Sequence, residues 1–191
     1  MVSTLAFSTE SSVVLEETFE QPLSPDWHWG LGTWAASNGV LHGFESGDRR
    51  HGPVKMHKLT LINAVIECEF RLIGKATFAG IIFNGSQERG HIVHLVMGND
   101  HVRVLAHLEK GESVEPLKQE HLLTVGEWHH VHLEFKGATI TAVLDGSQIT
   151  AAAPCIAEQK LSFGLGGDSG GPEGEKAGVL EFRHLKITAT P

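Results

Sequence analysis

The chain has 191 residues, and 15 lysines and arginines against 23 aspartates and glutamates give it a formal net charge of −8. Its 41% hydrophobic and 20% charged composition is that of an ordinary folded domain, and we expect one domain over residues 1–191. The acidic balance excludes a general nucleic-acid binder, which needs clustered cations. No apolar run approaches the roughly 20 residues that span a bilayer, so we expect no membrane partner, and no secretory signal is visible at the start of the chain.

The predicted elements are strands almost throughout. Asn38-Gly39 predicts a tight hairpin turn, because both residues tolerate a positive φ. Residues 64–72 then alternate with a period of two. One face of this strand carries Ile66, Cys68, Phe70 and Leu72, and the other carries Glu67, Glu69 and Arg71. Similar runs cover residues 78–84, 91–97, 102–108, 128–135, 139–144 and 179–187. With no amphipathic helical stripe of three turns, the pattern predicts an all-β fold, a jelly-roll sandwich of two antiparallel sheets.

The glycine-rich stretch near the end of the chain and the two cysteines also bear on the predicted fold. The glycine-rich stretch 164–175 is predicted to be a loop between the last two strands, because residues 179–187 still alternate after it. Cys68 and Cys155 are the only cysteines, which excludes a dense disulfide framework. We expect Cys68 to be a buried free thiol, while a bridge to Cys155 stays open.

Several short motifs occur in an order that resembles a known family. They are Gly32-Thr33-Trp34 with Asn38-Gly39-Val40-Leu41, Glu69-Phe70-Arg71, Ala79-Gly80-Ile81-Ile82-Phe83, Gly126-Glu127-Trp128-His129 and Asp145-Gly146. Together they resemble a concanavalin A-like lectin/glucanase sandwich, and within it the 3-keto-disaccharide hydrolase-like domain family, long classed as a domain of unknown function. The resemblance covers about residues 19–187. The chain departs from it at 77–80, where the family has Asn-Ser-Gly before the apolar strand, and at Asn84, where an Arg often closes that strand.

The resemblance implies a mostly bacterial, exported protein, extracellular or periplasmic, that binds carbohydrate or acts on it. Hydrolysis of a modified disaccharide and simple glycan binding both fit this expectation. A structural or protein-interaction sandwich without a small ligand is the third alternative. The oligomeric state is not predicted.

Glu69 and Glu67 are the candidate catalytic acids. Two residues apart on one face of a strand, their positions are separated by about 6.6 Å, which lies between the retaining and inverting spacings of glycosidases and assigns neither. One acid could raise the pKa of the other, as acid/base chemistry requires. The alternative is a solvated polar face, in which Arg71 pairs with Glu69 instead of orienting a sugar hydroxyl.

Six residues are candidate substrate-binding groups on the concave sheet: Trp29, Arg71, Asn84, His94, Arg103 and His107. A two-residue turn at Asn99-Asp100 places His94 on the polar side with Arg103, whereas a three-residue turn places it in the core. The two-residue turn is favoured because it keeps Val93, Leu95, Val102, Val104 and Ala106 inside together. Trp34 and Trp128 are expected in the core, while Trp27 and Trp29 lie in a loop-like segment that leaves their exposure open.

No organic cofactor is expected, and two metal sites are considered. His130 and His132 share a strand face and could supply two zinc ligands, but the sequence identifies no third. A structural calcium, implied by the superfamily resemblance, would take oxygen donors from loops. The candidate donors are Asp26, Asp168, Glu173 and Glu175.

Overall fold

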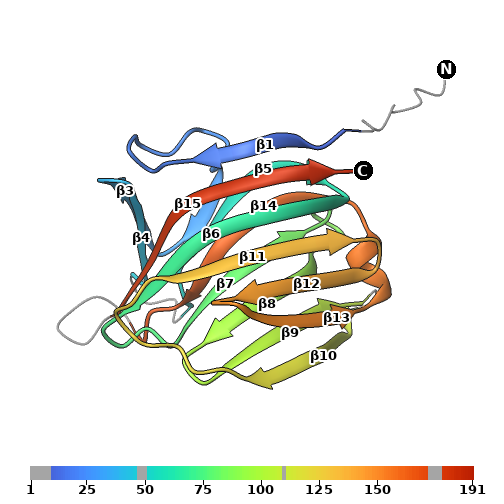
Figure 1. Ribbon diagram of the computed structural model, residues 1–191. Helices are drawn as coiled ribbons and strands as arrows, with labels where there is room; N and C mark the ends of the chain where they lie inside the picture. Colours follow the sequence, from blue (N-terminus) through green and yellow to red (C-terminus); the bar gives the residue numbers. More distant parts are fainter. Residues whose placement is uncertain (1–9, 47–50, 109–110, 172–177) are drawn as a thin grey trace.

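The computed structural model describes residues 10–46, 51–108, 111–171 and 178–191, and these form two antiparallel β-sheets packed face to face (Figure 1). The eight-stranded sheet contains β1 (Ser12–Glu17), β3 (Thr33–Ser37), β4 (Val40–Phe44), β6 (Asn63–Ile73), β11 (His129–Lys136), β12 (Thr139–Leu144), β13 (Ser147–Ala152) and β15 (Val179–Thr190). The seven-stranded sheet contains β2 (Trp29–Leu31), β5 (Val54–Leu61), β7 (Phe78–Asn84), β8 (His91–Gly98), β9 (His101–His107), β10 (Ser113–Glu120) and β14 (Lys160–Asp168). The short 3-10 helix η2 (Pro154–Ala157) precedes β14. The predicted all-β sandwich is confirmed.

The strand order places some strands that are consecutive in the chain in different sheets. The eight-stranded sheet runs β13-β12-β11-β6-β15-β4-β3, with β1 paired to β15, and the seven-stranded sheet runs β10-β9-β8-β7-β14-β5-β2. Consecutive strands β6 and β7 therefore belong to different sheets, and Figure 1 shows them in different layers. The outer side chains of these two strands consequently face opposite sides of the molecule.

The core lies between the inner faces of the two sheets. On β6 the predicted alternation is confirmed: Ile66, Cys68 and Phe70 are at most 1% exposed, whereas Glu67 and Glu69 are only half-buried. The buried faces of both sheets form one hydrophobic cluster. Cys68 and Cys155 both belong to it as free thiols, so the buried free thiol is confirmed and no bridge joins them.

The hairpin of β8 and β9 has the predicted two-residue turn. Met97 pairs with Val102, which leaves Asn99-Asp100 as the turn. His94 then lies on the outer face, while Val93 and Val104 are buried in the core. The favoured register is confirmed.

Some expectations about single elements are wrong. The predicted loop 164–175 begins later than expected: residues 164–168 are the second half of β14, because Gly164 pairs with Met56 on one side and Ile82 on the other. Residues 169–171 do lie between the last two strands, and residues 172–175 lie outside the described residues. Trp128 is not in the core; it is half-buried on the outer face of the eight-stranded sheet, between two guanidinium groups. Trp34 does pack against the core. In the described ranges no helix has the length and apolar character needed to cross a bilayer.

Candidate functional site

The candidate site is a hollow of about 380 Å³ in the outer face of the seven-stranded sheet. Strands β2, β5, β7, β8 and β14 contribute to it, together with segments that precede β2 and β5. The lining residues are His28, Trp29, His51, Val54, Met56, Ile82, Asn84, His91, His94 and Ser162. None of these described residues is an aspartate or glutamate.

Two glycines on β14 make the floor of this hollow. A Cβ at Gly164 would lie 2.3 Å from Sδ of Met56, and a Cβ at Gly166 would lie 3.1 Å from Val54 and 3.3 Å from Ile82. Because Gly164 and Gly166 have no side chains, the aliphatic groups of β5 and β7 lie close over this part of β14 from both sides. The result is an apolar floor that lies below the surrounding side chains.

An exposed tryptophan stands at one side of the floor. Trp29 is on the edge strand β2, pairs with Met56 across the sheet and keeps 50% of its surface exposed. Its neighbour Trp27 is only 3% exposed, and its Nε1 donates a 2.8 Å hydrogen bond to a carboxylate oxygen of Glu17. The two tryptophans of this segment thus have different roles: Trp27 packs in the core and Trp29 is available to a ligand.

The rim beside β7 and β8 is polar and pre-oriented. Nδ1 of His91 lies 2.8 Å from Oδ1 of Asn84. A carbonyl oxygen only accepts, so this contact requires the proton of a neutral His91 ring on Nδ1 and leaves Nε2 as an acceptor. The amide nitrogen of Asn84 keeps its two donors, and Ser162 lies directly opposite Asn84 on β14.

Three imidazole rings form a compact cluster at this rim. The ring centroids of His91, His94 and His107 are 4.6, 4.7 and 5.3 Å apart. Burial, and then the neighbouring rings His91 and His107, lower the pKa of His94 to about 3. Burial also lowers the pKa of His91, with His51 adding to the effect, and the pKa of His107, with His91 and Arg89 adding to it. All three rings are therefore neutral at pH 7.

Five of the predicted substrate-binding residues lie on this sheet. Trp29, Asn84 and His94 line the hollow, and the ring of His107 borders it through its contact with His94. Arg103 is on the same outer face but outside the hollow, where it pairs with Glu115 at 3.5 Å.

The predicted catalytic acids lie elsewhere, which corrects the expectation of one common site. Glu67, Glu69 and Arg71 project from β6 on the outer face of the eight-stranded sheet, opposite the hollow that contains Asn84 and His94. The two glutamates line a second hollow of about 330 Å³. Its lining residues are Glu16, Glu17, Thr18, Glu67, Cys68, Glu69, His130, His184, Leu185 and Lys186.

The alternative in which Arg71 pairs with Glu69 is not the one that the structure shows. Arg71 Nε donates to Glu181 at 2.6 Å, and Glu69 instead accepts from Arg183, because these residues face each other between β6 and β15. Burial alone would raise the pKa of Glu69, but the hydrogen bond and charge of Arg183 outweigh it and hold that pKa below its usual value. The ring of Trp128 packs against both guanidinium groups, 4.6 Å from Arg71 and 4.0 Å from Arg183.

The sequence pattern missed His91 for a physical reason. Strict alternation would place His91 on the core side with Val93, two residues later. In the structure Asn84 pairs with His91 and Phe83 with Val93, so Ile92 is an extra residue in a β-bulge. Ile92 and Val93 are both buried, and His91 moves to the outer face beside His94. His28, His51 and Ser162 carried no motif that could have identified them.

The described residues do not assemble a metal site. In the described ranges no group of three or more histidines, cysteines, aspartates and glutamates is arranged to hold a metal ion. Asp168 accepts hydrogen bonds from Thr77 at 2.6 Å and from the Gly170 amide at 2.8 Å, so each of its two carboxylate oxygens already has a partner within the chain. The other proposed calcium donors are Asp26, which is described, and Glu173 and Glu175, which lie outside the described residues.

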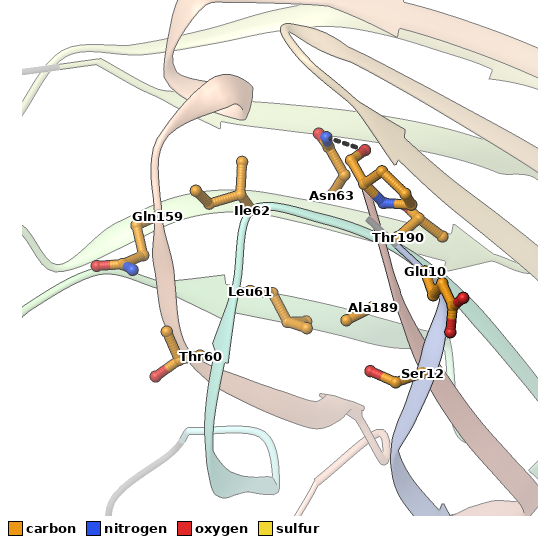
Figure 2. Close-up of a pocket in the computed structure, with 10 residues that line it drawn as sticks. Glu10, Ser12, Thr60, Leu61, Ile62, Asn63, Gln159, Ala189 and Thr190 are labelled. Carbon is orange, nitrogen blue, oxygen red and sulfur yellow. Dashed lines mark hydrogen bonds between the residues drawn. The ribbon is translucent and has the colours of Figure 1, made fainter. Parts of the chain in front are cut away.

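A third hollow, of about 350 Å³, lies where β1 begins and β15 ends (Figure 2). Figure 2 shows Leu61, Ile62 and Ala189 along its middle, and the Asn63 amide donates to the Pro191 carbonyl at 2.7 Å. Its described lining contains no aromatic ring and no cation. It therefore lacks the groups that make the hollow of the seven-stranded sheet the candidate site.

Comparisons with known proteins agree with this architecture. The Laminin G domain family model matches residues 77–168, from β7 to the end of β14. A sequence search of curated proteins returns no match. Among solved structures, LamAcat from Zobellia galactanivorans is similar, with a TM-score of 0.68 and 13% identity over 94% of this chain and 98% of that chain.

Two further structures have lower scores. A provisionally assigned glycosyl hydrolase from Parabacteroides distasonis has a TM-score of 0.58 and 16% identity, over 94% of this chain and 99% of its own. The carbohydrate-binding module CBM66 from Bacillus subtilis has a TM-score of 0.55 and 14% identity, over 83% of this chain and 89% of its own. At these identities the likeness shows the fold, which is a concanavalin A-like sandwich as the sequence motifs predicted.

Proposed function

We propose that this protein binds carbohydrate in the hollow of the seven-stranded sheet. The observation that carries the proposal is the exposed ring of Trp29 beside the apolar floor of Met56, with amide, imidazole and hydroxyl groups on the rim. Sugars present an apolar face of C–H groups and a periphery of hydroxyls, and this surface offers a partner for each. The similarity to a carbohydrate-binding module and to a glycosyl hydrolase supports the same class of ligand.

Each rim residue has a defined hydrogen-bonding role in the proposal. Asn84 donates from its amide nitrogen, because its oxygen is occupied by His91. His91 accepts at Nε2, and the Ser162 hydroxyl both donates and accepts. We also propose that the protein is exported, as the family resemblance implies.

The test is isothermal titration with a panel of disaccharides and longer oligosaccharides, starting from hits on a glycan array. Trp29→Ala should weaken binding by about tenfold or more, the usual cost of truncating an aromatic anchor. Leu122→Ala is the matched control, since Leu122 is 85% exposed and outside the hollow. Equal affinities for the two variants, or no binding to any glycan, would contradict the proposal and favour a protein-interaction sandwich.

We propose hydrolysis of a 3-keto-disaccharide as the second candidate, located on the opposite sheet. The observation in its favour is that Glu67 and Glu69 line one hollow together. The ionised Glu69 would act as base or nucleophile and Glu67 as acid. Turnover of 3-keto-glycosides by the wild type and its loss in Glu69→Gln would support this activity, and no turnover by the wild type would exclude it.

A further inference from the structure

The ligand class can be narrowed by the histidine cluster at the rim of the proposed glycan site. His91 and His94 come from β8 and His107 from the end of β9, and the β-bulge at Ile92 brings all three rings to the same outer face. No core side chain separates them: each ring contacts the other two. Protonating neighbouring imidazole rings is unfavourable, because their positive charges repel each other. A cluster of titratable groups of this kind is a candidate functional site.

Two nitrogens of the cluster are buried without a partner. Nε2 of His94 and Nε2 of His107 are both inaccessible to solvent and form no hydrogen bond among the described residues. A buried polar atom without a protein partner costs stability, so each of these nitrogens retains an unused hydrogen-bonding position for a water or ligand oxygen. Nδ1 of His107 is already engaged by the Ser113 hydroxyl at 2.9 Å, which fixes the orientation of that ring. The described residues of the cluster do not form a group arranged to hold a metal ion, and we consider a hydrogen-bonding ligand.

Basic side chains lie beside the cluster. His51 faces His91, and Arg89 faces His107 and donates to the backbone carbonyls of His91 and His107 at 2.7 and 2.6 Å. Two described carboxylates in this region are already paired: Glu158 accepts from Arg89 at 2.6 Å, and Glu115 pairs with Arg103 at 3.5 Å. Although the chain has a net charge of −8, the described residues that line this hollow include no carboxylate.

We propose that the hollow binds a sugar with an anionic oxygen group, a carboxylate or a sulfate, at the cluster of His91, His94 and His107, and that binding takes up a proton. The anion supplies the negative charge that stabilises a protonated ring, which the described lining residues do not provide. The proposal rests on carbohydrate binding in the same hollow.

The sign of the pH dependence follows from linkage. In the free protein the pKa values of the three rings are lowered, so the rings are neutral near pH 7. A bound anion raises the pKa of the ring that it contacts, so the complex holds more protons than the free protein. Affinity for the anionic sugar therefore increases as the pH falls below 7, by up to about tenfold per pH unit for each proton taken up.

The experiment compares three ligands with the same backbone: a neutral oligosaccharide, its uronate form and its sulfated form. Titration calorimetry at pH 5.5 and pH 8, in buffers of different ionisation enthalpy, measures affinity and proton uptake together. We expect an anionic form to bind at least tenfold more tightly at pH 5.5 than at pH 8, with proton uptake, and the neutral form to show no such change. The preferred anionic form identifies carboxylate or sulfate as the recognised group.

His94→Gln should remove most of the pH dependence, whereas His121→Gln, a half-buried histidine that lines neither this hollow nor the second one, should preserve it. If neutral and anionic sugars bind equally and both depend on Trp29, the inference is wrong while the proposed function stands. If no form binds, both are wrong.

Discussion

Phe70 and Glu67 are three positions apart on β6, and they contribute to stability in different ways. Phe70 is fully buried against the ring of His129, with a centroid distance of 5.5 Å, whereas Glu67 faces solvent and lies 3.3 Å from His132. Phe70→Ala should therefore lower the free energy of unfolding by about 3–5 kcal/mol, the usual effect of deleting a buried aromatic. Glu67→Ala should lower it by less than about 1 kcal/mol. Urea denaturation of both variants is the measurement, and equal losses would contradict the assignment of the two faces.

The titration of His94 predicts how stability depends on pH. Its pKa is about 3 in the folded protein, mainly because of burial, and about 6.5 in an unfolded chain. Since the folded pKa is the lower one, the unfolded state binds more protons between these values. The stability contributed by the neutral ring is complete above pH 6.5 and is lost as the pH falls toward 3. His94→Gln should make the decline of unfolding free energy over this window shallower than in the wild type, as measured by urea denaturation at a series of pH values.

At the scale of the element, β14 shapes the site through residues that have no side chain. In Gly164→Ala the new methyl group would meet the Met56 thioether, which is flexible and can move away from β14 into the hollow. We expect affinity for the bound glycan to fall at least tenfold, while the free energy of unfolding changes by only about 1 kcal/mol.

Gly80→Ala is the matched control for this variant. Gly80 lies on the neighbouring strand β7, and a Cβ there would lie 3.6 Å from the nearest atom, which is ordinary contact. Gly80→Ala should retain affinity and stability. A Gly164→Ala protein that binds like the wild type would show that Met56 does not form the ligand surface.

The element scale also shows what sequence patterns can predict. Alternation placed the side chains of β6 correctly, and the apolar residues of β8 and β9 selected the two-residue turn. Both predictions succeed because a one-residue error would expose a whole buried face. The position of His91 on the outer face was not predicted, because the bulge at Ile92 adds one residue without a signal in the composition. The strand at residues 164–168 was not predicted, because a glycine-rich sequence normally indicates a loop.

At the scale of the whole molecule, the two outer faces have different chemistry. The face of the eight-stranded sheet carries cross-strand ion pairs such as Arg71 with Glu181 and Glu69 with Arg183. The face of the seven-stranded sheet carries the apolar hollow and the imidazole rings. A period of two distinguishes inside from outside but contains no information on which sheet a strand joins. For that reason the sequence placed Glu69 and Asn84 in one site, whereas the crossover between β6 and β7 separates them.

This separation predicts that substitutions on the eight-stranded sheet leave glycan binding intact. Glu69→Gln keeps a hydrogen-bonding group opposite Arg183 and removes only the charge, so its affinity for the glycan should stay within about twofold of the wild type. Arg71→Ala should cost about 1–3 kcal/mol of stability, because Glu181 is buried and would lose the guanidinium, keeping His42 at 3.2 Å as its partner among the described residues. Where it is folded, Arg71→Ala should bind as well as the wild type. Calorimetric titration next to Asn84→Ala checks both, since Asn84→Ala alters the hollow itself and should weaken binding. Loss of binding in Glu69→Gln together with full affinity in Asn84→Ala would move the ligand to the eight-stranded sheet and favour the second hollow as the functional site.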